Sequence, residues 1–511
     1  MISKENKAKV VMVQGTASSA GKSILVTALC RILKQDGYRV APFKSQNMSL
    51  NSFVTREGGE IGRAQVVQAE AAGIEPTVDM NPILLKPEAD SKSPVIVMGK
   101  VMETLQARKY YEHKADLLNI VSGALNRLRS AYDVVVIEGA GSTAEINLKD
   151  REIVNMRIAK LANSPVLLIG DIDRGGIFAS LIGTVDLLEP DERKLVKGLV
   201  INKFRGDISL FDSGVRFIEE RSGVPCVGVI PYFRDIAIAQ EDSVYLDERQ
   251  EHGESRTLDI AVIRLPHLSN YDDFDPLERE GCRVHYITYP RQLGNPELII
   301  IPGSKSTVAD LNFLRDTGLA DEITRLNNSG TPVMGICGGY QMLGRRLDDP
   351  HGVESSERST QGLQLLDMVT VFNREKTTTQ VKGTVSTNLG ILSHAHGKEI
   401  EGYEIHMGES VENNEDSAFQ ILQRPGGKAG YSDGAISSKG TVLGTYIHGI
   451  FNKDGFRAGF LDSLREYHRM PVLESYNTEE KDREYDKLAD LVRGNLDIPQ
   501  IYRIIEAGIQ E

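Results

Sequence analysis

Cysteine is scarce in this chain of 511 residues, and none of its four cysteines belongs to a CxxC pair: they are Cys30, Cys226, Cys282 and Cys337. Neither a disulfide framework nor a cysteine-based zinc site follows from such spacing, and a reducing compartment fits it best. The first residues also lack an apolar run long enough for a signal peptide or a membrane anchor. We therefore expect a cytoplasmic protein.

Positive charge is in deficit: 59 lysines and arginines face 72 aspartates and glutamates, a net charge of −13. The negative charge of the protein would repel nucleic acid and anionic membrane surfaces, so we expect neither as a partner. An anionic substrate would need a locally basic pocket. The length leaves room for roughly two to four domains.

Short β-branched runs alternate with amphipathic segments in the first half of the chain. One such segment, residues 22–36, is predicted to be a helix capped near Gly37. Continuous apolar strands covered on both faces are typical of a parallel sheet. The strands predicted here are 9–14, 133–139, 164–171, 197–203 and 224–231.

A polar and charged stretch then interrupts the pattern, and we interpret residues 241–256 as a linker. The strand pattern restarts at 258–266, 283–289, 297–303, 331–337 and 441–449. We expect an α/β fold throughout, with a nucleotide-binding domain at 1–240 and a second α/β domain at 257–455. Residues 456–511 are helical in pattern and are predicted to form a C-terminal extension.

The stretch "VQGTASSAGKS", residues 13–23, resembles a phosphate-binding loop with one residue too many between its glycines. It follows a predicted strand and opens a predicted helix, where backbone N–H groups and the helix N-terminus favour a polyanion. Lys22 would bridge the β- and γ-phosphates of ATP, and the Ser23 hydroxyl would bind Mg²⁺. A glycine turn without a ligand is the alternative. The candidate ATP-binding residues are Gly15, Thr16, Ser19, Ala20, Gly21, Lys22 and Ser23.

Acidic and amide side chains follow other strands of the same predicted sheet. Glu138 in "VVVIEGAGS" and Asp171 in "GDIDRGG" end two strands, where ligands of open α/β sheets gather. Either acid is a candidate Mg²⁺ ligand beside Ser23, with a helix cap as the alternative role. Asn202, just past a third strand, is predicted to contact the adenine edge or to cap a loop.

Cys337 lies in "VMGICGGYQMLG", a Gly-x-Cys-x-Gly pattern between a predicted strand and a predicted helix. Such a nucleophile elbow exposes its side chain at a helix N-terminus, which favours the thiolate. A buried structural cysteine, the alternative, fits Cys30 and Cys226 better. His448 in "GTYIHGIF" is the predicted base, with His406 as the other candidate. Backbone amides in "IIPGSKST" could form an oxyanion hole.

Taken together, these motifs resemble the cobyric acid synthase family, glutamine-dependent amidotransferases of corrinoid biosynthesis. The resemblance covers nearly the whole chain and includes the longer loop, Gly-x5-Gly-Lys-Ser/Thr, which is similar to that of dethiobiotin synthetase. Its motifs are "GTASSAGKS", "PFKSQNMSLNS", "EGAGS", "GDIDRGGIFAS", "SNYDDFDPL", "PGSKST", "GICGGYQMLG", "GYEIHMG" and "GTYIHGIF".

The resemblance implies a class I glutaminase domain in which Cys337 releases ammonia from L-glutamine through a thioester. The N-terminal domain would use ATP and Mg²⁺ to phosphorylate carboxylates of adenosylcobyrinic acid a,c-diamide. Ammonia would then give the amides at the b, d, e and g side chains. An acyl phosphate is the better acyl donor, and neutral ammonia, unlike ammonium, can attack it.

Further residues are assigned by the resemblance. Substrate contacts are expected at Lys44, Gln46, Asn47, Ser49 and Arg174. The oxyanion hole and the glutamine pocket are expected at Gly303, Ser304, Gly338 and Gln341.

Two departures from related enzymes are visible in the sequence. Class I glutaminases usually carry His-x-Glu, whereas Gly449 and Ile450 follow His448, which predicts a Cys–His dyad. Related a,c-diamide synthases carry an acidic stretch where this chain has "SQNMSLNS", which indicates a different corrinoid step.

Other readings remain open at this point. A cobyrinate a,c-diamide synthase or a cell-wall precursor amidase would share most of these motifs. A partitioning ATPase would carry a lysine where Thr16 follows Gly15, and it would have no use for Cys337 and His448. The sequence does not decide between a monomer and a homo-oligomer.

Overall fold

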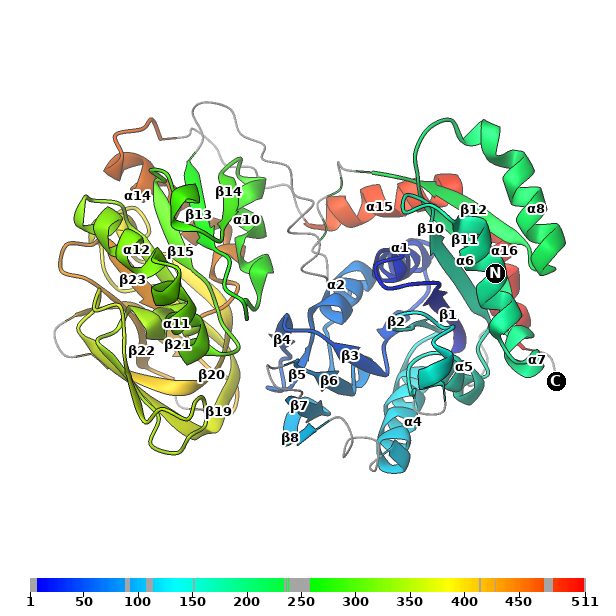
Figure 1. Cartoon of the computed structure of the whole chain (residues 1–511), viewed down its shortest axis with the longest axis horizontal. Helices are drawn as coiled ribbons and strands as arrows, with labels where there is room; N and C mark the ends of the chain where they lie inside the picture. Colours follow the sequence, from blue (N-terminus) through cyan, green and yellow to red (C-terminus); the bar gives the residue numbers. More distant parts are fainter. Residues whose placement is uncertain are drawn as a thin grey trace. The chain divides into compact units, whose positions relative to one another are not determined.

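The chain forms two compact units in a computed structural model (Figure 1). The structure describes residues 7–87, 92–106, 114–149, 152–233, 236, 238, 258–412, 415–427, 429–472 and 481–509. The first unit comprises Met1–Ser49, Glu60–Ser243 and Glu479–Glu511, and the second comprises Leu50–Gly59 and Val244–Thr478. The predicted linker, 241–256, lies outside the described residues.

A six-stranded parallel sheet forms the centre of the first unit, in the order β12-β11-β10-β1-β9-β2. Five of these strands lie where the sequence predicts them, and β2 is the one it missed. Their bounds are β1 (Lys9–Gly15), β2 (Val40–Phe43), β9 (Val134–Glu138), β10 (Val166–Asp171), β11 (Val196–Phe204) and β12 (Cys226–Pro231). β1, β9 and β10 are buried along almost their whole length, as expected of a sheet covered on both faces.

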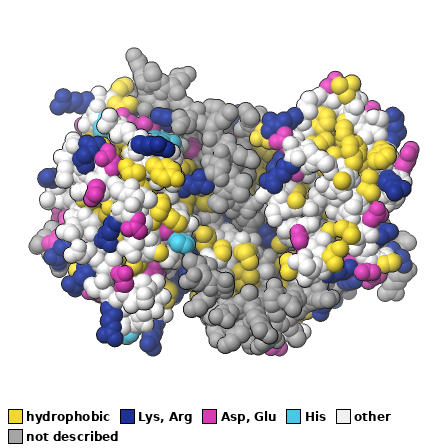
Figure 2. Space-filling view, in the orientation of Figure 1, with side chains coloured by type: hydrophobic (Ala, Val, Ile, Leu, Met, Phe, Trp, Pro, Cys, Tyr) yellow, Lys and Arg dark blue, Asp and Glu magenta, His cyan; other side chains and the backbone are white. Residues whose placement is uncertain are grey.

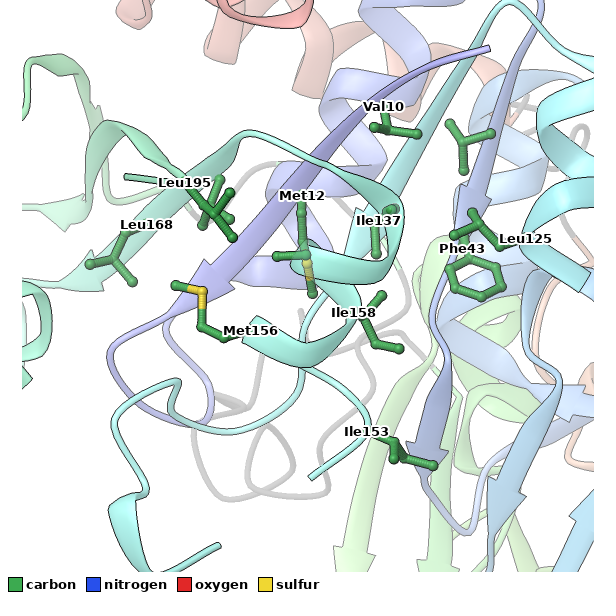
Figure 3. Close-up of a cluster of buried hydrophobic side chains, with 14 of the residues drawn as sticks. Val10, Met12, Phe43, Leu125, Ile137, Ile153, Met156, Ile158, Leu168 and Leu195 are labelled. Atoms are coloured by element: carbon green, nitrogen blue, oxygen red, sulfur yellow. The ribbon is translucent and has the colours of Figure 1, made fainter. Parts of the chain in front are cut away.

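Alternate residues of β1 enter two different hydrophobic clusters, so each face of the sheet has its own layer of helices. Val10 and Met12 pack with residues of α4 (Lys114–Ala131), α5 (Met156–Ala162), α6 (Ile177–Leu187) and α8 (Asp212–Ser222), in the cluster that Figure 3 shows in part. Val11 and Val13 pack with α1 (Lys22–Gln35), α2 (Arg63–Ala72), α15 (Lys481–Asn495) and α16 (Ile498–Ala507).

Smaller elements complete the first unit. A second sheet has the order β3-β6-β7-β8, and β5 and several short helices connect the larger elements. Their bounds are β3 (Gln46–Met48), β5 (Glu60–Gly62), β6 (Ile83–Leu85), β7 (Lys92–Val97), β8 (Lys100–Gln106), η1 (Val78–Met80), η4 (Ile146–Leu148), α7 (Pro190–Arg193) and η5 (Ile208–Phe211).

The second unit is built on one large mixed sheet, in the order β14-β13-β15-β16-β23-β22-β21-β19-β17-β18, with β20 paired to β19. Its parallel half, from β14 to β23, matches the five predicted strands. Their bounds are β13 (Asp259–Ile263), β14 (Arg283–Ile287), β15 (Leu298–Ile301), β16 (Val333–Ile336) and β23 (Val442–Thr445).

The other half of this sheet, which is mostly antiparallel, was not predicted. It consists of β17 (Arg346–Asp348), β18 (Ser359–Gln361), β19 (Met368–Val385), β20 (Glu399–Glu412), β21 (Asp416–Gln423) and β22 (Tyr431–Ile436). The helices are η6 (Tyr271–Phe274), α10 (Asp275–Arg279), η7 (Pro290–Gln292), α11 (Thr307–Asp316), α12 (Leu319–Asn328), α13 (Gly338–Leu343), η8 (Gly390–Leu392), η9 (Ile450–Asn452) and α14 (Asp454–Tyr467).

The predicted C-terminal extension, residues 456–511, is divided between the units. Phe456 and Phe460 of α14 lie in the core of the second unit, whereas Leu488 and Ile501 of α15 and α16 lie in the core of the first. Residues Leu50–Gly59, within the predicted first domain, pack with the second unit and include β4 (Ser52–Val54). Apolar burial sets the membership of the C-terminal helices, whereas hydrogen bonds such as that between Asn51 and Asn270 join residues 50–59 to the second unit.

Charged side chains of both signs are interspersed on the visible face of the molecule (Figure 2). Within the described part of the chain, none of the helices combines the length and the apolar character that crossing a membrane requires.

Candidate active sites

Cys337 lies on a sharp turn between β16 and α13, in the second unit. Its backbone has φ 51° and ψ −109°, a conformation that costs a non-glycine residue on the order of 1–3 kcal/mol. Gly339 permits this turn because a Cβ there would overlap the carbonyl oxygen of Ile301. The Cys337 thiol contacts the Ile405 carbonyl oxygen at 3.6 Å. The strain and the close packing are those of a nucleophile elbow, as the sequence predicts.

His448 lies three residues after the end of β23, where its side chain interacts with that of Cys337. Its Nδ1 lies 2.7 Å from Oδ2 of Asp273 in η6, and the Gly449 N–H donates to the other carboxylate oxygen, also at 2.7 Å. All three side chains are buried. The predicted dyad is therefore incomplete, because Asp273 supplies the third member from an element far away in the sequence.

The charge of Asp273 determines the ionisation of His448. Burial by itself lowers the pKa of a histidine, but the charge and hydrogen bond of Asp273, together with the contact to Cys337, raise the pKa of His448 to about 10. His448 is therefore a cation at neutral pH. The imidazolium can therefore donate a proton to a group that leaves a carbon atom bound to the sulfur.

His406, the other candidate base, has a different environment. Its ring stacks on Tyr446 with centroids 3.9 Å apart, and Nδ1 lies 2.7 Å from the Gly408 carbonyl oxygen. Burial lowers the pKa of His406 to about 4, so it is neutral at physiological pH. The structure therefore favours His448, and not His406, as the histidine that acts together with Cys337.

The loop that carries Gly303 and Ser304 lies against both the elbow and the histidine. A Cβ on Gly303 would lie 2.8 Å from Cε1 of His448, and a Cβ on Gly338 would lie 3.0 Å from the Ser304 amide nitrogen. The buried Gln341 accepts a hydrogen bond from Thr307 at 3.1 Å. Backbone amides of this loop are near enough to the elbow to act on an oxyanion formed there.

The phosphate-loop sequence connects β1 to α1 in the first unit, as predicted. Gly21 has φ 102° and precedes α1, and the Lys22 ammonium donates to the Ala17 and Gly141 carbonyl oxygens, each at 2.9 Å. The helix N-terminus and the lysine therefore face the same loop, which is the arrangement that binds the phosphates of a nucleotide.

Glu138, at the end of β9, lies next to Ser23. The Ser23 hydroxyl donates to Oε1 of Glu138 at 2.8 Å, and the Lys44 ammonium lies 2.9 Å from the same oxygen. Gln65 and Gln68 of α2 donate to Oε2. Burial alone would raise the pKa of Glu138, but Lys44, together with the hydrogen bonds from Gln68 and Ser23, keeps it below its ordinary value. An ionised carboxylate beside a hydroxyl is a donor pair that suits Mg²⁺.

Asp171 and Asn202 occupy neighbouring strand ends. The Asp171 carboxylate pairs with Lys203 at 2.9 Å and accepts from the Asp173 N–H at 2.9 Å, whereas the Ser23 hydroxyl donates to Glu138. Asn202 donates to the Ala20 carbonyl oxygen at 3.0 Å, as a loop cap would. Of the two predicted acids, the geometry therefore favours Glu138 as the metal ligand. No group of three or more potential metal-binding His, Cys, Asp or Glu side chains occurs in the described ranges.

Comparison with known proteins identifies both units. Residues 11–244 match the CobQ/CobB/MinD/ParA nucleotide binding domain, and residues 259–456 match the CobB/CobQ-like glutamine amidotransferase domain. The chain is 59% identical over 503 residues to a cobyric acid synthase of Dehalococcoides mccartyi strain ATCC BAA-2266 / KCTC 15142 / 195, covering 98% of this chain and 99% of that protein. The chain belongs to the cobyric acid synthase family.

A second member of the cobyric acid synthase family, from Sorangium cellulosum strain So ce56, is 52% identical over 513 residues, 98% of this chain and 99% of its own length. A solved structure titled PurLQS from Thermotoga maritima is 18% identical and covers 42% of this chain and 99% of its own, with a TM-score of 0.32. The chain is thus an enzyme, a glutamine amidotransferase ligase with a P-loop nucleotide-binding domain, which confirms the predicted family, α/β fold and class of activity.

The substrate residues predicted for a cobyric acid synthase all lie in the first unit. Lys44 is buried and paired with Glu138, so its charge is directed at the phosphate-loop site. Asn47 donates to Gln65 at 3.0 Å, and the Ser49 N–H donates to the Leu85 carbonyl oxygen at 3.1 Å. Gln46 begins β3, and Arg174 approaches Asp171 at 3.7 Å.

The sequence alone did not indicate several residues that the structure brings to these two candidate sites. Asp273 lies within the motif "SNYDDFDPL", but nothing in that motif indicates which of its four acidic or amide residues reaches His448. Gln65 and Gln68 lie on a helix whose pattern is that of an ordinary buried helix. Only the closure of the fold brings these side chains to Glu138 and His448.

Proposed function

We propose that Cys337, His448 and Asp273 release ammonia from glutamine, and that the Lys22 loop with Ser23 and Glu138 activates corrinoid carboxylates with ATP. The enzyme thereby amidates the b, d, e and g carboxylates of adenosylcobyrinic acid a,c-diamide. The observation that carries the proposal is the triad around the strained Cys337 in one unit and the Ser23–Glu138–Lys44 cluster in the other.

In the glutaminase step, the Cys337 thiolate attacks the side-chain amide carbon of glutamine. Backbone amides of the Gly303–Ser304 loop would stabilise the oxyanion that forms. His448 then gives its proton to the amide nitrogen, and the C–N bond breaks. Ammonia departs, and the glutamyl group remains bound to Cys337 as a thioester. The neutral His448 next takes a proton from water, and the hydroxide formed releases glutamate and restores the thiolate.

In the synthetase step, a corrinoid carboxylate oxygen attacks the γ-phosphorus of ATP and ADP leaves. Lys22 and the loop N–H groups would hold the phosphates in line for this transfer. Ser23 and Glu138 would hold Mg²⁺, which offsets negative charge on the phosphates when bound. Ammonia then attacks the carbonyl carbon of the acyl phosphate. The C–O bond to phosphorus breaks, inorganic phosphate departs, and the product is the amide.

Corrinoid carboxylates need nearby positive charge and hydrogen-bond donors. We propose that Lys44 and Arg174 provide the charge, and that Gln46, Asn47 and Ser49 provide polar contacts next to the phosphate loop. Asp171 then acts through Lys203 and Arg174 and is not itself a metal ligand. The net charge of −13 supports small-molecule partners and not nucleic acid. The scattered cysteines support a reducing compartment, the cytoplasm, as the place of action.

Two substitutions test the division of labour. Cys337→Ala should abolish glutamine-dependent amidation of the a,c-diamide and preserve amidation driven by a high concentration of ammonium. Lys22→Ala should stop amidation from either nitrogen source and leave glutamine hydrolysis measurable. Mass spectrometry of the corrinoid and glutamate release are the two readouts. Loss of both nitrogen sources in a folded Cys337→Ala protein would contradict the proposal, as would normal amidation by Lys22→Ala.

A further inference from the structure

Residues Leu50–Gly59 precede the glutaminase sequence by about two hundred positions, yet they belong to the unit that contains Cys337 and His448. Asn51, Ser52, Val54 and Thr55 of this segment are buried. The Gln380 side chain donates to the Val54 carbonyl oxygen at 2.9 Å, which fixes the segment beside β19. We call residues 50–59 the insert segment.

The insert segment is hydrogen-bonded to Asn270, the residue before η6. The Asn270 N–H donates to Oδ1 of Asn51 at 2.8 Å, and Oδ1 of Asn270 accepts from the Ser52 N–H at 3.3 Å. Asn270 has φ 54°, and its carbonyl oxygen accepts from the Asp273 N–H at 3.1 Å. The turn that presents Asp273 to His448 is therefore anchored on the insert segment.

A second connection runs through Tyr403 of β20. Its hydroxyl donates to the Ser52 carbonyl oxygen at 3.0 Å and accepts from the Asn270 amide at 3.0 Å. The Tyr403 ring stacks on the His448 ring, with centroids 5.5 Å apart and planes at 23°. Backbone hydrogen bonds also join Tyr403 to His448 in both directions. The phenol thus links the insert segment to the face of the histidine.

We propose that the insert segment positions the glutaminase triad, with Asn51 holding the Asp273 turn through Asn270 and Ser52 holding the His448 ring through Tyr403. This inference rests on the glutaminase role proposed above for Cys337. A misplacement of about 1 Å in a catalytic group can reduce a rate about a hundredfold, so two short links of this kind are enough to control the reaction.

The insert segment also continues at both ends into residues of the phosphate-loop unit. Before it, the chain contains Lys44, which pairs with Glu138. After it, the chain contains Gln65 and Gln68, which donate to the same carboxylate. The insert segment is therefore connected in the chain, on both sides, to residues that surround Glu138, the proposed metal ligand.

The test compares two substitutions with one control in the full-length enzyme. Asn51→Ala removes the acceptor of the Asn270 N–H, and Tyr403→Phe removes only the hydroxyl and keeps the stacked ring. Arg56→Ala changes an exposed residue of the same segment and serves as the matched control. We expect kcat for glutamine-dependent amidation to fall by up to about a hundredfold in the first two proteins, with KM for glutamine changed much less and ammonium-dependent amidation unchanged.

A pH profile separates positioning from general destabilisation. The ionisable groups around His448 are Asp273 of η6, Cys337 of the elbow, Tyr403 of β20 and His406 of the same strand. A displaced Asp273 would hold the imidazolium less strongly, so the alkaline limb of kcat/KM for glutamine should move to lower pH. Partial unfolding would lower the whole profile without moving its limb.

The outcomes are distinct. A profile for Asn51→Ala and Tyr403→Phe that matches Arg56→Ala would overturn the positioning role, as would an equal loss of glutamine- and ammonium-dependent amidation. The proposed function itself is tested separately by Cys337→Ala: glutamine-dependent turnover by that protein would refute the glutaminase assignment, whatever the insert-segment variants show.

Discussion

At the scale of single residues, the two proposed sites hold buried charges that are paired with opposite charges. His448 stays a cation because Asp273 lies 2.7 Å from its ring, and Glu138 stays an anion because Lys44 lies 2.9 Å from its carboxylate. A buried charge without such a partner is strongly destabilising or becomes neutral. Removing one member of either pair should therefore change the ionisation or position of the other.

Asp273→Asn keeps the size of the side chain and removes its charge. Because Asp273 raises the pKa of His448 to about 10, its loss should move that pKa toward the ordinary value. The imidazolium would then be lost at lower pH, and the alkaline limb of kcat/KM for glutamine should shift in the same direction. We also expect kcat to fall by a factor on the order of 10⁴. Ammonium-dependent amidation is the internal control, and an unmoved limb would refute the triad.

Glu138→Gln and Asp171→Asn distinguish the two acids predicted as Mg²⁺ ligands. The Ser23 hydroxyl donates to Glu138, so Glu138→Gln should raise the Mg²⁺ concentration for half-maximal amidation by about tenfold to a hundredfold. Asp171→Asn should leave that concentration nearly unchanged. Steady-state titration with Mg²⁺ at saturating ATP measures both, and the reverse order of effects would reassign the ligand.

At the scale of helices and strands, patterning predicted the parallel strands and missed most of the antiparallel ones. Strands such as β10 are continuous apolar runs because helices cover both faces, and that signal is strong. β19, in contrast, alternates buried and less buried positions over much of its length, but its buried positions include Thr370, Thr379 and Gly383. Because polar and small residues occupy part of its buried face, its sequence shows little of the apolar–polar alternation that marks a half-buried strand.

The C-terminal helices α15 and α16 should be essential to the first unit because they supply part of one face of its core. Leu488→Ala removes a fully buried side chain and should lower the free energy of unfolding by about 2–5 kcal/mol. Asp490→Ala, at an exposed position of α15, is the matched control. Urea titrations, monitored by the loss of nucleotide-dependent activity, measure the difference in the free energy of unfolding. Equal values for Leu488→Ala and Asp490→Ala would place α15 outside the core.

At the scale of the whole molecule, the order of residues in the chain does not follow the order of the units. The α/β fold and the two kinds of domain predicted from the sequence agree with the family matches, since strand–loop–helix motifs are local. It did not place residues 50–59 with the second unit or 481–509 with the first. Those assignments depend on contacts such as that of Asn51 with Asn270, whose sequence separation no local pattern reports.

Because each unit has its own hydrophobic clusters, we expect unfolding of the intact protein to depart from a single two-state transition. Mg²⁺–ADP at about a hundred times its Kd should stabilise the transition of the first unit by about 2.7 kcal/mol. The transition of the second unit should move much less. Differential scanning calorimetry measures both, and Lys22→Ala should abolish the shift. A single transition that moves as a whole would contradict this independence.

The exchange of segments between the units also constrains how such an enzyme can be inherited. If the gene were split between residues 241 and 256, the N-terminal product would carry residues 50–59, which belong to the second unit. The C-terminal product would carry the helices at 481–509, which belong to the first unit. Neither half would keep its own core complete. Recombination that trades one half for a homologous half would therefore have to preserve both borrowed pieces, so the two activities should pass together from ancestor to descendant as a single reading frame.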